Sequence, residues 1–294
     1  MFNDVSLIIK TFERPEALTR LLDSVRTLDF DGAVLVADDS KKPYRESILD
    51  TYGDLVDEYI TLPFNVGLSA GRNALLDRVQ TPYFVLNDDD FVYGPRTDLR
   101  WMRSQLAATD LELLGGLIWE PNPVRWSRLR QPTLKETLRE AYSTARTLLR
   151  NLGEAAYSTN RFHGHIEATE DTVTLSHDRT PNAVPFHRCD YTLNFFMAET
   201  DAVRAKVGGW AEELKVQEHW EFFYRAKLGG LHVAYTDKSG VIHIPDRTAH
   251  YNSFREHQTK YRRLGLELHG LRKLVLGDWT AATIPGPDPA AVAE

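Results

Sequence analysis

The sequence predicts an α/β fold with a mostly parallel sheet flanked by helices. Two apolar stretches, Val5–Ile9 and Ala33–Ala37, read as buried strands, and leucines and valines recur at helical spacing between them. A third apolar stretch, Tyr83–Leu86, ends at an asparagine and three consecutive aspartates. Strands that alternate with helices are typical of parallel sheets, in which ligands bind beyond the carboxyl ends of the strands. We therefore expect the chemistry of this chain at one edge of its sheet.

Composition places the chain among soluble, enzyme-sized proteins. Its 294 residues are 42% hydrophobic and 26% charged, which suits one large domain or one domain with an added lobe. The formal net charge of −7 argues against nucleic acid as the main partner, because no basic face dominates. The single cysteine, Cys189, excludes an intramolecular disulfide and a cysteine zinc site. No apolar run approaches the ~20 residues of a membrane span and Met1–Asp4 does not resemble a signal peptide, so we expect a cytoplasmic protein.

The first strand–helix–strand unit brings polar residues to both strand ends. Lys10–Arg14 reads as a loop, Pro15 is a favoured first helical residue, and the second strand stops at Asp38. A helix near residues 43–52 and a short strand, Glu58–Leu62, follow. The residues that this unit should place at the ligand-binding edge are Thr11, Arg14, Asp38 and Asp39.

The stretch Asn65–Asn73 opens the next helix with two glycines. Gly67 and Gly71 let the backbone approach a ligand closely, and Arg72 falls in the first turns, where a helix N-terminus favours an anion. The alternative is a tight loop with a solvated arginine.

The aspartates Asp88, Asp89 and Asp90 end a buried strand, which is costly unless a cation lies against them. In extended backbone, side chains alternate, so we expect Asp88 and Asp90 to point the same way and Asp89 the other. Two carboxylates sharing a site favour a hard cation such as Mg²⁺ or Mn²⁺, which also binds diphosphate. The alternative is a solvated acidic turn.

The middle of the chain changes in character. A helix around Asp98–Ala108 and a strand, Leu113–Trp119, precede it. The segment Thr133–Leu152 is helical in pattern, and Ile166–Leu175 alternates like the strands of a hairpin. We interpret residues 120–185 as an insertion or acceptor-side lobe, in which His163 and His165 are surface or structural residues.

The late segment Val216–Arg225 reads as a helix with Glu218, His219 and Glu221 at its start. The helix dipole alone could account for the two glutamates, but a transferase needs a base, and these side chains could serve. Downstream, His243 lies in a short strand, and residues 250–276 read as one long basic amphipathic helix. That helix could contact a membrane surface, donor phosphates or a second subunit, or simply be solvated.

Taken in order, these motifs resemble the inverting glycosyltransferases of the GT-A fold, in the broad family 2 group, and are closest in pattern to the β-1,4-N-acetylgalactosaminyltransferases. The motifs are Lys10–Arg14, Ala37–Ser40, Asn65-x-Gly67 with Ala70–Asn73, Asp88–Phe91, Asp190 with Asn194–Phe196, and His219-x-Glu221–Phe223. The resemblance covers roughly residues 4–119 and 186–245. It implies a Rossmann-like GT-A sheet with a nucleotide-sugar-binding half (1–119), an insertion lobe (120–185), an acceptor and catalytic half (186–245) and a C-terminal helix and tail (246–294).

The resemblance also implies substrates and site residues. The donor would be a UDP-sugar, the acceptor a hydroxyl on a glycan or glycoconjugate, and the cofactor Mn²⁺ or Mg²⁺. Asp39 would bind the uracil, Asp88 would face the ribose or sugar, and Asp90 would ligate the metal together with His243. The other residues expected around the nucleotide are Thr11, Arg14, Asp38, Asn65, Gly67, Arg72 and Asp89.

The family's usual base is an aspartate that follows a glutamate, and here that aspartate is replaced by His219. We rank Glu218 first as the base, because the family uses a carboxylate, and keep His219 and Glu221 as alternatives. Two other functions remain open. A nucleotidyltransferase would show a Gly-rich loop after the first strand, and Lys10–Arg14 contains no glycine. A non-catalytic sugar-nucleotide or glycan-binding module would keep the donor pocket and lack the base.

Overall fold

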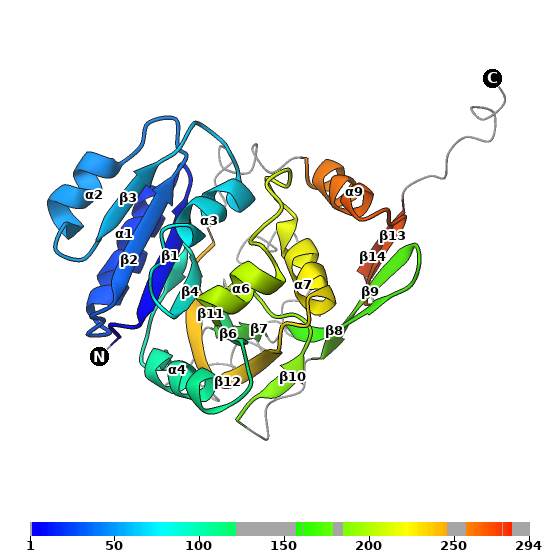
Figure 1. Ribbon diagram of the computed structural model, residues 1–294. Helices are drawn as coiled ribbons and strands as arrows, with labels where there is room; N and C mark the ends of the chain where they lie inside the picture. The colour runs from blue at the N-terminus through cyan, green and yellow to red at the C-terminus, as the bar shows by residue number, and fades with distance from the viewer. Residues whose placement is uncertain are drawn as a thin grey trace, which may run out of the picture.

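A large central sheet with helices on both faces forms the body of the protein (Figure 1). The structure is a computed structural model that describes residues 2–121, 157–160, 162–178, 185–245, 257–277 and 279–283. The main path of the sheet has the strand order β10-β12-β6-β11-β4-β1-β2-β3. The predicted α/β class is therefore confirmed.

The first half of the chain builds the parallel part of this sheet. Its elements are β1 (Val5–Thr11), α1 (Pro15–Arg26), β2 (Ala33–Asp38), α2 (Arg45–Tyr52), β3 (Glu58–Thr61), α3 (Leu68–Leu76), β4 (Tyr83–Asp88), β5 (Phe91–Val92), α4 (Leu99–Ala108) and β6 (Leu113–Pro121). Strands β3, β2, β1 and β4 are parallel neighbours. Their register pairs Lys10 with Asp88 and Thr11 with Asp38, so the three strands end at one level.

The second half makes the sheet mixed rather than mostly parallel. Its elements are β7 (Tyr157–Asn160), β8 (His163–Ala168), β9 (Thr172–Asp178), β10 (His187–Cys189), β11 (Phe196–Glu199), α6 (Thr200–Lys206), α7 (Glu218–Leu228), β12 (Val233–His243), α9 (Gln258–Leu268), β13 (Lys273–Leu276) and β14 (Trp279–Thr283). Strand β11 enters between β4 and β6 and runs antiparallel to both. The loop immediately before β11 therefore lies at the carboxyl end of β4.

Alternating side chains divide the core into two layers. In β1, Ile8 packs with α3 and α7 on one face, whereas Leu7 and Ile9 pack with α1 and α4 on the other. The same alternation holds in β2 and β4, as expected for strands buried on both faces. The helices thus fix the sheet from both sides and leave its carboxyl edge for polar residues.

A second sheet, with the strand order β14-β13-β9-β8, stands beside α7 and α9 (Figure 1). Strands β8 and β9 are antiparallel, which confirms the predicted hairpin, and β9 pairs in parallel with β13. The expected insertion and the C-terminal segment therefore share a sheet. The helix predicted over Thr133–Leu152 lies outside the described residues.

The prediction of one long helix over residues 250–276 was wrong at its end. Helix α9 stops at Leu268, and the chain continues as β13. Gly270 has φ 66°, and the backbone N–H groups of Gly270 and Leu271 donate to the carbonyls of Glu267 and Leu266. These two bonds form a Schellman motif, which ends a helix at a left-handed glycine.

In the part of the chain that the structure describes, no helix combines the length and apolar character required to cross a bilayer.

Candidate active site

The three aspartates at the end of β4 pair with two different arginines, which differs from the arrangement predicted from the sequence. Strand β4 ends at Asp88, and Asp89 and Asp90 form a turn. The predicted alternation of side chains was therefore wrong, since it holds only while the backbone stays extended. Arg14 bonds to both Asp89 and Asp90, whereas Asp88 bonds to Arg72.

The turn is buried and held by cations. Asp89 is fully buried and accepts hydrogen bonds from Arg14 and from the Thr11 hydroxyl, at 2.7 Å for Thr11. Burial raises the pKa of the Asp89 carboxyl, against the opposing effect of Arg14. At Asp90, burial acts in the same direction, but hydrogen bonds and charges from His243 and Arg14 outweigh it and lower the pKa.

Asp90 and His243 form the pair that could hold a metal. Their Oδ2 and Nε2 atoms lie 3.4 Å apart, although they come from sequence positions on opposite halves of the chain. Ligands about 2.1 Å from an octahedral ion lie about 3 Å apart at right angles, so this separation fits two neighbouring ligands. One carboxylate and one imidazole suit Mn²⁺ when diphosphate oxygens complete the shell. In the described residues, no group of three or more His, Cys, Asp or Glu is arranged to hold a metal ion.

Arg72 links the end of β4 to the start of α7. Its guanidinium group is fully buried and donates to Asp88 at 2.8 Å and to Glu218 at 2.6 Å. Helix α3 carries Arg72, and Glu218 begins α7, so the ion pair joins positions that are 146 residues apart in sequence. Two carboxylates on one buried arginine also neutralise charge that would otherwise be costly at this depth.

Asn194 connects the same carboxylate to His219. Its amide nitrogen donates to Asp88 at 3.2 Å, and its oxygen faces His219 Nδ1 at 2.7 Å. Because that oxygen can only accept, Nδ1 carries the proton and Nε2 is the basic nitrogen. Among the residues that the structure describes, buried Nε2 has no hydrogen-bond partner. Burial and then the charge of Arg72 lower the pKa of His219 to about 4, so the ring is neutral at pH 7.

We expect His219 to make the protein less stable in mild acid. In the unfolded chain its imidazole takes up a proton near pH 6.5, but in the fold only near pH 4, so stability falls as the pH drops between these values. Between pH 7 and pH 5 the loss should be up to about 2 kcal/mol. Urea unfolding of the wild type and His219→Gln at both pH values measures it. Equal losses for the two proteins would contradict the assignment, since only the wild type carries this titrating group.

Glu221 is held away from this edge. Its carboxylate accepts two bonds from Arg225, at 2.6 and 2.9 Å, and lies 2.9 Å from His269 Nε2. Arg225 in turn donates to the carbonyls of Val207 and Gly209. Among the three expected base candidates, the structure therefore brings Glu218 and His219 to the aspartates and uses Glu221 to fasten α7 to its neighbours.

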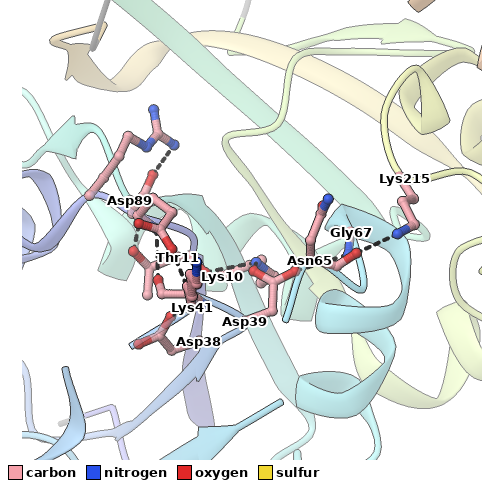
Figure 2. Close-up of polar contacts among 12 residues, drawn as sticks. Lys10, Thr11, Asp38, Asp39, Lys41, Asn65, Gly67, Asp89 and Lys215 are labelled. Carbon is pink, nitrogen blue, oxygen red and sulfur yellow. Dashed lines mark hydrogen bonds and ion pairs between the residues drawn. The ribbon is translucent and has the colours of Figure 1, made fainter. Parts of the chain in front are cut away.

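The end of β2 organises the loop before α3, as Figure 2 shows. Asp38 is fully buried and accepts from the backbone of Ser40 and Tyr44 and from the Tyr59 hydroxyl. Asp38 therefore shapes the loop after β2.

Asp39 holds the Gly67 loop. Its carboxylate accepts the Gly67 N–H at 2.9 Å, and its carbonyl accepts the Asn65 N–H at 2.9 Å. The Asn65 carbonyl then accepts a bond from Lys215, at 2.5 Å. A side chain on Gly67 would meet the Lys215 backbone at 2.6 Å, and the residue has φ 103°, so a glycine is required here.

Three residues at this edge were not assigned a role by the sequence. Lys10 forms an ion pair with Asp39, Asn194 bridges Asp88 and His219, and Glu120 lies 3.2 Å from His243 Nδ1. Lys10 carried a signal, because a charged residue ends an otherwise apolar strand. Asn194 lies in one of the motifs that carry the resemblance, although no role followed from it, and Glu120 carried no signal, since its neighbours come from distant segments.

The assembled edge can bind an anion and move a proton. It presents a carboxylate–imidazole pair, a buried arginine and a glutamate within contact of that arginine. Such a set suits a diphosphate leaving group that departs while a hydroxyl loses its proton.

Comparison with known proteins finds a family model and relatives that are similar to this chain in sequence. A model of glycosyl transferase family 2 matches residues 6–161. Beta-1,4 N-acetylgalactosaminyltransferase 2 of Mus musculus is 40% identical over 116 residues, which are 40% of this chain and 22% of that protein. Beta-1,4 N-acetylgalactosaminyltransferase 1 of Homo sapiens is 32% identical over 229 residues, which are 78% of this chain and 37% of that protein. The chain thus spans well under half the length of these curated relatives.

Solved structures share the fold. TarS 1-349 of S. aureus in complex with UDP-GlcNAc has a TM-score of 0.59 at 18% identity, covering 89% of this chain and 65% of that one. Mannosyltransferase PcManGT from Pyrobaculum calidifontis in complex with GDP-Man and Mn²⁺ has a TM-score of 0.55 at 13% identity, covering 90% of this chain and 64% of that one. At such identities the likeness concerns the fold alone.

Proposed function

Because this chain belongs to glycosyl transferase family 2, we propose that it transfers a sugar, with inversion and with the help of a divalent metal, from a UDP-sugar to an acceptor hydroxyl. The acceptor is a glycan or glycoconjugate. The observation that carries the proposal is the meeting of Asp88, Asp90, Arg72, Glu218 and His243 at one sheet edge. Relatives that are named N-acetylgalactosaminyltransferases and a neighbour bound to UDP-GlcNAc support the choice of donor class.

The donor half of the site binds the nucleotide. Asp39 accepts from the base, with Thr11, Arg14 and the Asn65–Gly67 loop around it, and Asp88 faces the ribose or sugar. Asp90 and His243 would hold Mn²⁺ or Mg²⁺, of which Mn²⁺ accepts an imidazole ligand more readily. When bound, the ion would neutralise the negative charge that collects on the departing diphosphate.

The catalytic half moves the proton. Glu218 accepts the proton of the acceptor hydroxyl as its oxygen attacks the anomeric carbon from the face opposite the diphosphate. Arg72 holds Glu218 and Asp88 in place, and its positive charge favours the anionic leaving group. His219 is the weaker candidate for the base, since its lowered pKa of about 4 leaves it little affinity for a proton.

Titration calorimetry with UDP and Mn²⁺, followed by an assay for UDP released from a panel of UDP-sugars, tests the proposal. A transferase of this kind binds both ligands and slowly hydrolyses its correct donor when no acceptor is present. Binding of UDP without turnover of any donor toward any acceptor would instead indicate a sugar-nucleotide-binding module.

We expect Glu120 to support the metal site through His243. The imidazole Nδ1 lies 3.2 Å from Glu120 Oε1, an arrangement that leaves Nε2 free to ligate a metal next to Asp90. Glu120→Gln should weaken Mn²⁺ binding about 10-fold or more in the presence of UDP. Calorimetry measures the effect, and Glu112→Gln, immediately before the start of the same strand, is the control. Unchanged Mn²⁺ affinity in Glu120→Gln would show that His243 needs no such partner.

We assign the steps of the reaction to the segments expected from the sequence. We propose that residues 1–119 bind the donor, that 186–245 supply the base and that 120–185 contact the acceptor. The cytoplasmic location and any peripheral membrane contact stay predictions from the sequence.

A further inference from the structure

We propose that Arg262, on α9, positions the proposed base. It holds Gln217, the residue directly before Glu218, in the backbone conformation from which α7 begins. Helix α9 lies outside the segments that carry the resemblance to known transferases, so the resemblance gives this arginine no role. The inference rests on the proposed function, in which Glu218 accepts the proton of the acceptor hydroxyl.

Helix α7 begins from a residue in a costly conformation. Gln217 precedes the helix with φ 65° and ψ 18°, in the left-handed region, and its side chain makes no capping bond to the helix. Residues other than glycine adopt this conformation at an energetic cost, so the surrounding structure must hold Gln217 in it. Glu218 follows as the first residue of α7, buried and bonded to Arg72 at 2.6 Å. The backbone of Gln217 therefore decides where the Glu218 carboxylate lies.

The Gln217 side chain is held by α9. Arg262 Nε and Nη2 donate to Gln217 Oε1 at 3.2 and 3.0 Å, and the Gln217 amide nitrogen donates to Gln258 Oε1 at 3.4 Å. Gln258 and Arg262 are one turn apart on α9, so they lie on the same face of that helix. A hydrogen bond from a charged donor is stronger than one between neutral groups, and the planar guanidinium group fixes its direction. Arg262 is thus the main contact to Gln217.

Helix α9 is itself fixed against α7, beside which it lies in Figure 1. A side chain on Gly265 would lie 2.7 Å from the Trp220 ring, so a glycine is required where the two helices meet. Leu266 is fully buried in the same core layer as Trp220. Beyond the helix, β13 pairs with β9 in the second sheet. These contacts fix the direction from which the arginine of α9 reaches the start of α7.

Arg262 affects the reaction through the geometry of the base. A base must lie within hydrogen-bond reach of the proton that it removes, and a small displacement costs much of the rate. Without Arg262, Gln217 would relax from the left-handed region, and Glu218 would shift with the first turn of α7. The residues proposed to bind UDP lie on β1, β2, β4 and α3 and in their loops, so the affinity for UDP should change little.

Arg262→Met, which removes the donors and keeps much of the side-chain length, tests the inference. We expect kcat to fall about 10- to 100-fold on the UDP-sugar that the wild type turns over, because the base is displaced. The dissociation constant for UDP with Mn²⁺, measured by calorimetry, should stay within about twofold of the wild-type value. Arg262→Lys keeps the charge and a donor and should recover part of the lost kcat.

Two changes at Gln217 show whether Arg262 acts through this residue. Gln217→Ala removes the acceptor and should lower kcat as Arg262→Met does. The double variant should then be no slower than either single variant, because both changes remove the same contact. Gln217→Gly also removes the acceptor, but glycine adopts the left-handed conformation without strain, so its kcat should lie closer to the wild-type value.

Arg263→Met is the matched control. Arg263 is the next residue on α9, is exposed and pairs with Glu267 of the same helix at 2.8 Å. The variant therefore removes an equal charge without touching Gln217, and it should keep the wild-type kcat. Circular dichroism and urea unfolding of each variant show whether it folds.

The possible failures are distinguishable. A folded Arg262→Met with the wild-type kcat, or with a loss of UDP affinity as large as its loss of kcat, would overturn the role of Arg262 and leave the proposed function standing. Where Arg262→Met does not fold, equal kcat values for Gln217→Ala and Gln217→Gly would overturn it. A wild type that turns over no UDP-sugar would overturn the proposed function, and the inference with it.

Discussion

Replacing Asp90 by Asn is expected to abolish metal-dependent turnover while the protein stays folded. The amide oxygen can still accept the bond from Arg14, which now reaches Asp90 at 2.7 Å, so the turn keeps its contact. The lost negative charge, however, removes the carboxylate that would bind the metal next to His243. We expect kcat/KM to fall at least about 100-fold, because metal stabilisation of a leaving diphosphate is a large part of such catalysis.

Calorimetry and circular dichroism distinguish a loss of metal binding from a loss of folding in that variant. Mn²⁺ binding in the presence of UDP should weaken strongly, and the far-ultraviolet spectrum should match the wild type. Asp110→Asn is the control, since Asp110 is exposed and pairs with the exposed Arg188. Normal Mn²⁺-dependent turnover in Asp90→Asn would remove the metal from the proposed mechanism.

Glu218→Gln is expected to lower kcat by about 10²- to 10⁴-fold, the usual contribution of a general base. Glutamine retains an oxygen for the bond from Arg72, so the guanidinium group stays in place and UDP and Mn²⁺ should bind with near wild-type affinity. A loss of kcat without a loss of binding is the result that identifies a base rather than a structural ion pair.

The same change at Glu221 provides the comparison. Glu221→Gln lies one turn further along α7 and weakens the contacts with Arg225 and His269. We expect it to lower the urea midpoint and to leave the kcat of the folded protein close to the wild-type value. If Glu218→Gln retains full kcat and His219→Gln does not, the imidazole would be the base in spite of its low pKa.

The sequence was most informative where structure is local. Apolar runs that stop at Asp38 and Asp88 were predicted as strands, and both strands end at these residues. It failed where a local pattern was continued too far. Asp89 and Asp90 leave the strand in a turn, and Gly270 stops a helix that the periodicity extended to residue 276. In both places a backbone change at one or two residues redirects the chain that follows.

The sequence by itself determined which residue types stand at the ends of the strands and helices, and hence the metal, nucleotide and base candidates. Only the tertiary structure decided which of them meet. It paired Arg72 with Glu218, brought His243 to Asp90 and buried Lys10 against Asp39, while it held Glu221 apart. The physical reason is separation along the sequence. Hydrophobic periodicity determines a helix or strand over a few neighbouring residues, but contacts across a sheet edge join distant segments and depend on strand order and register.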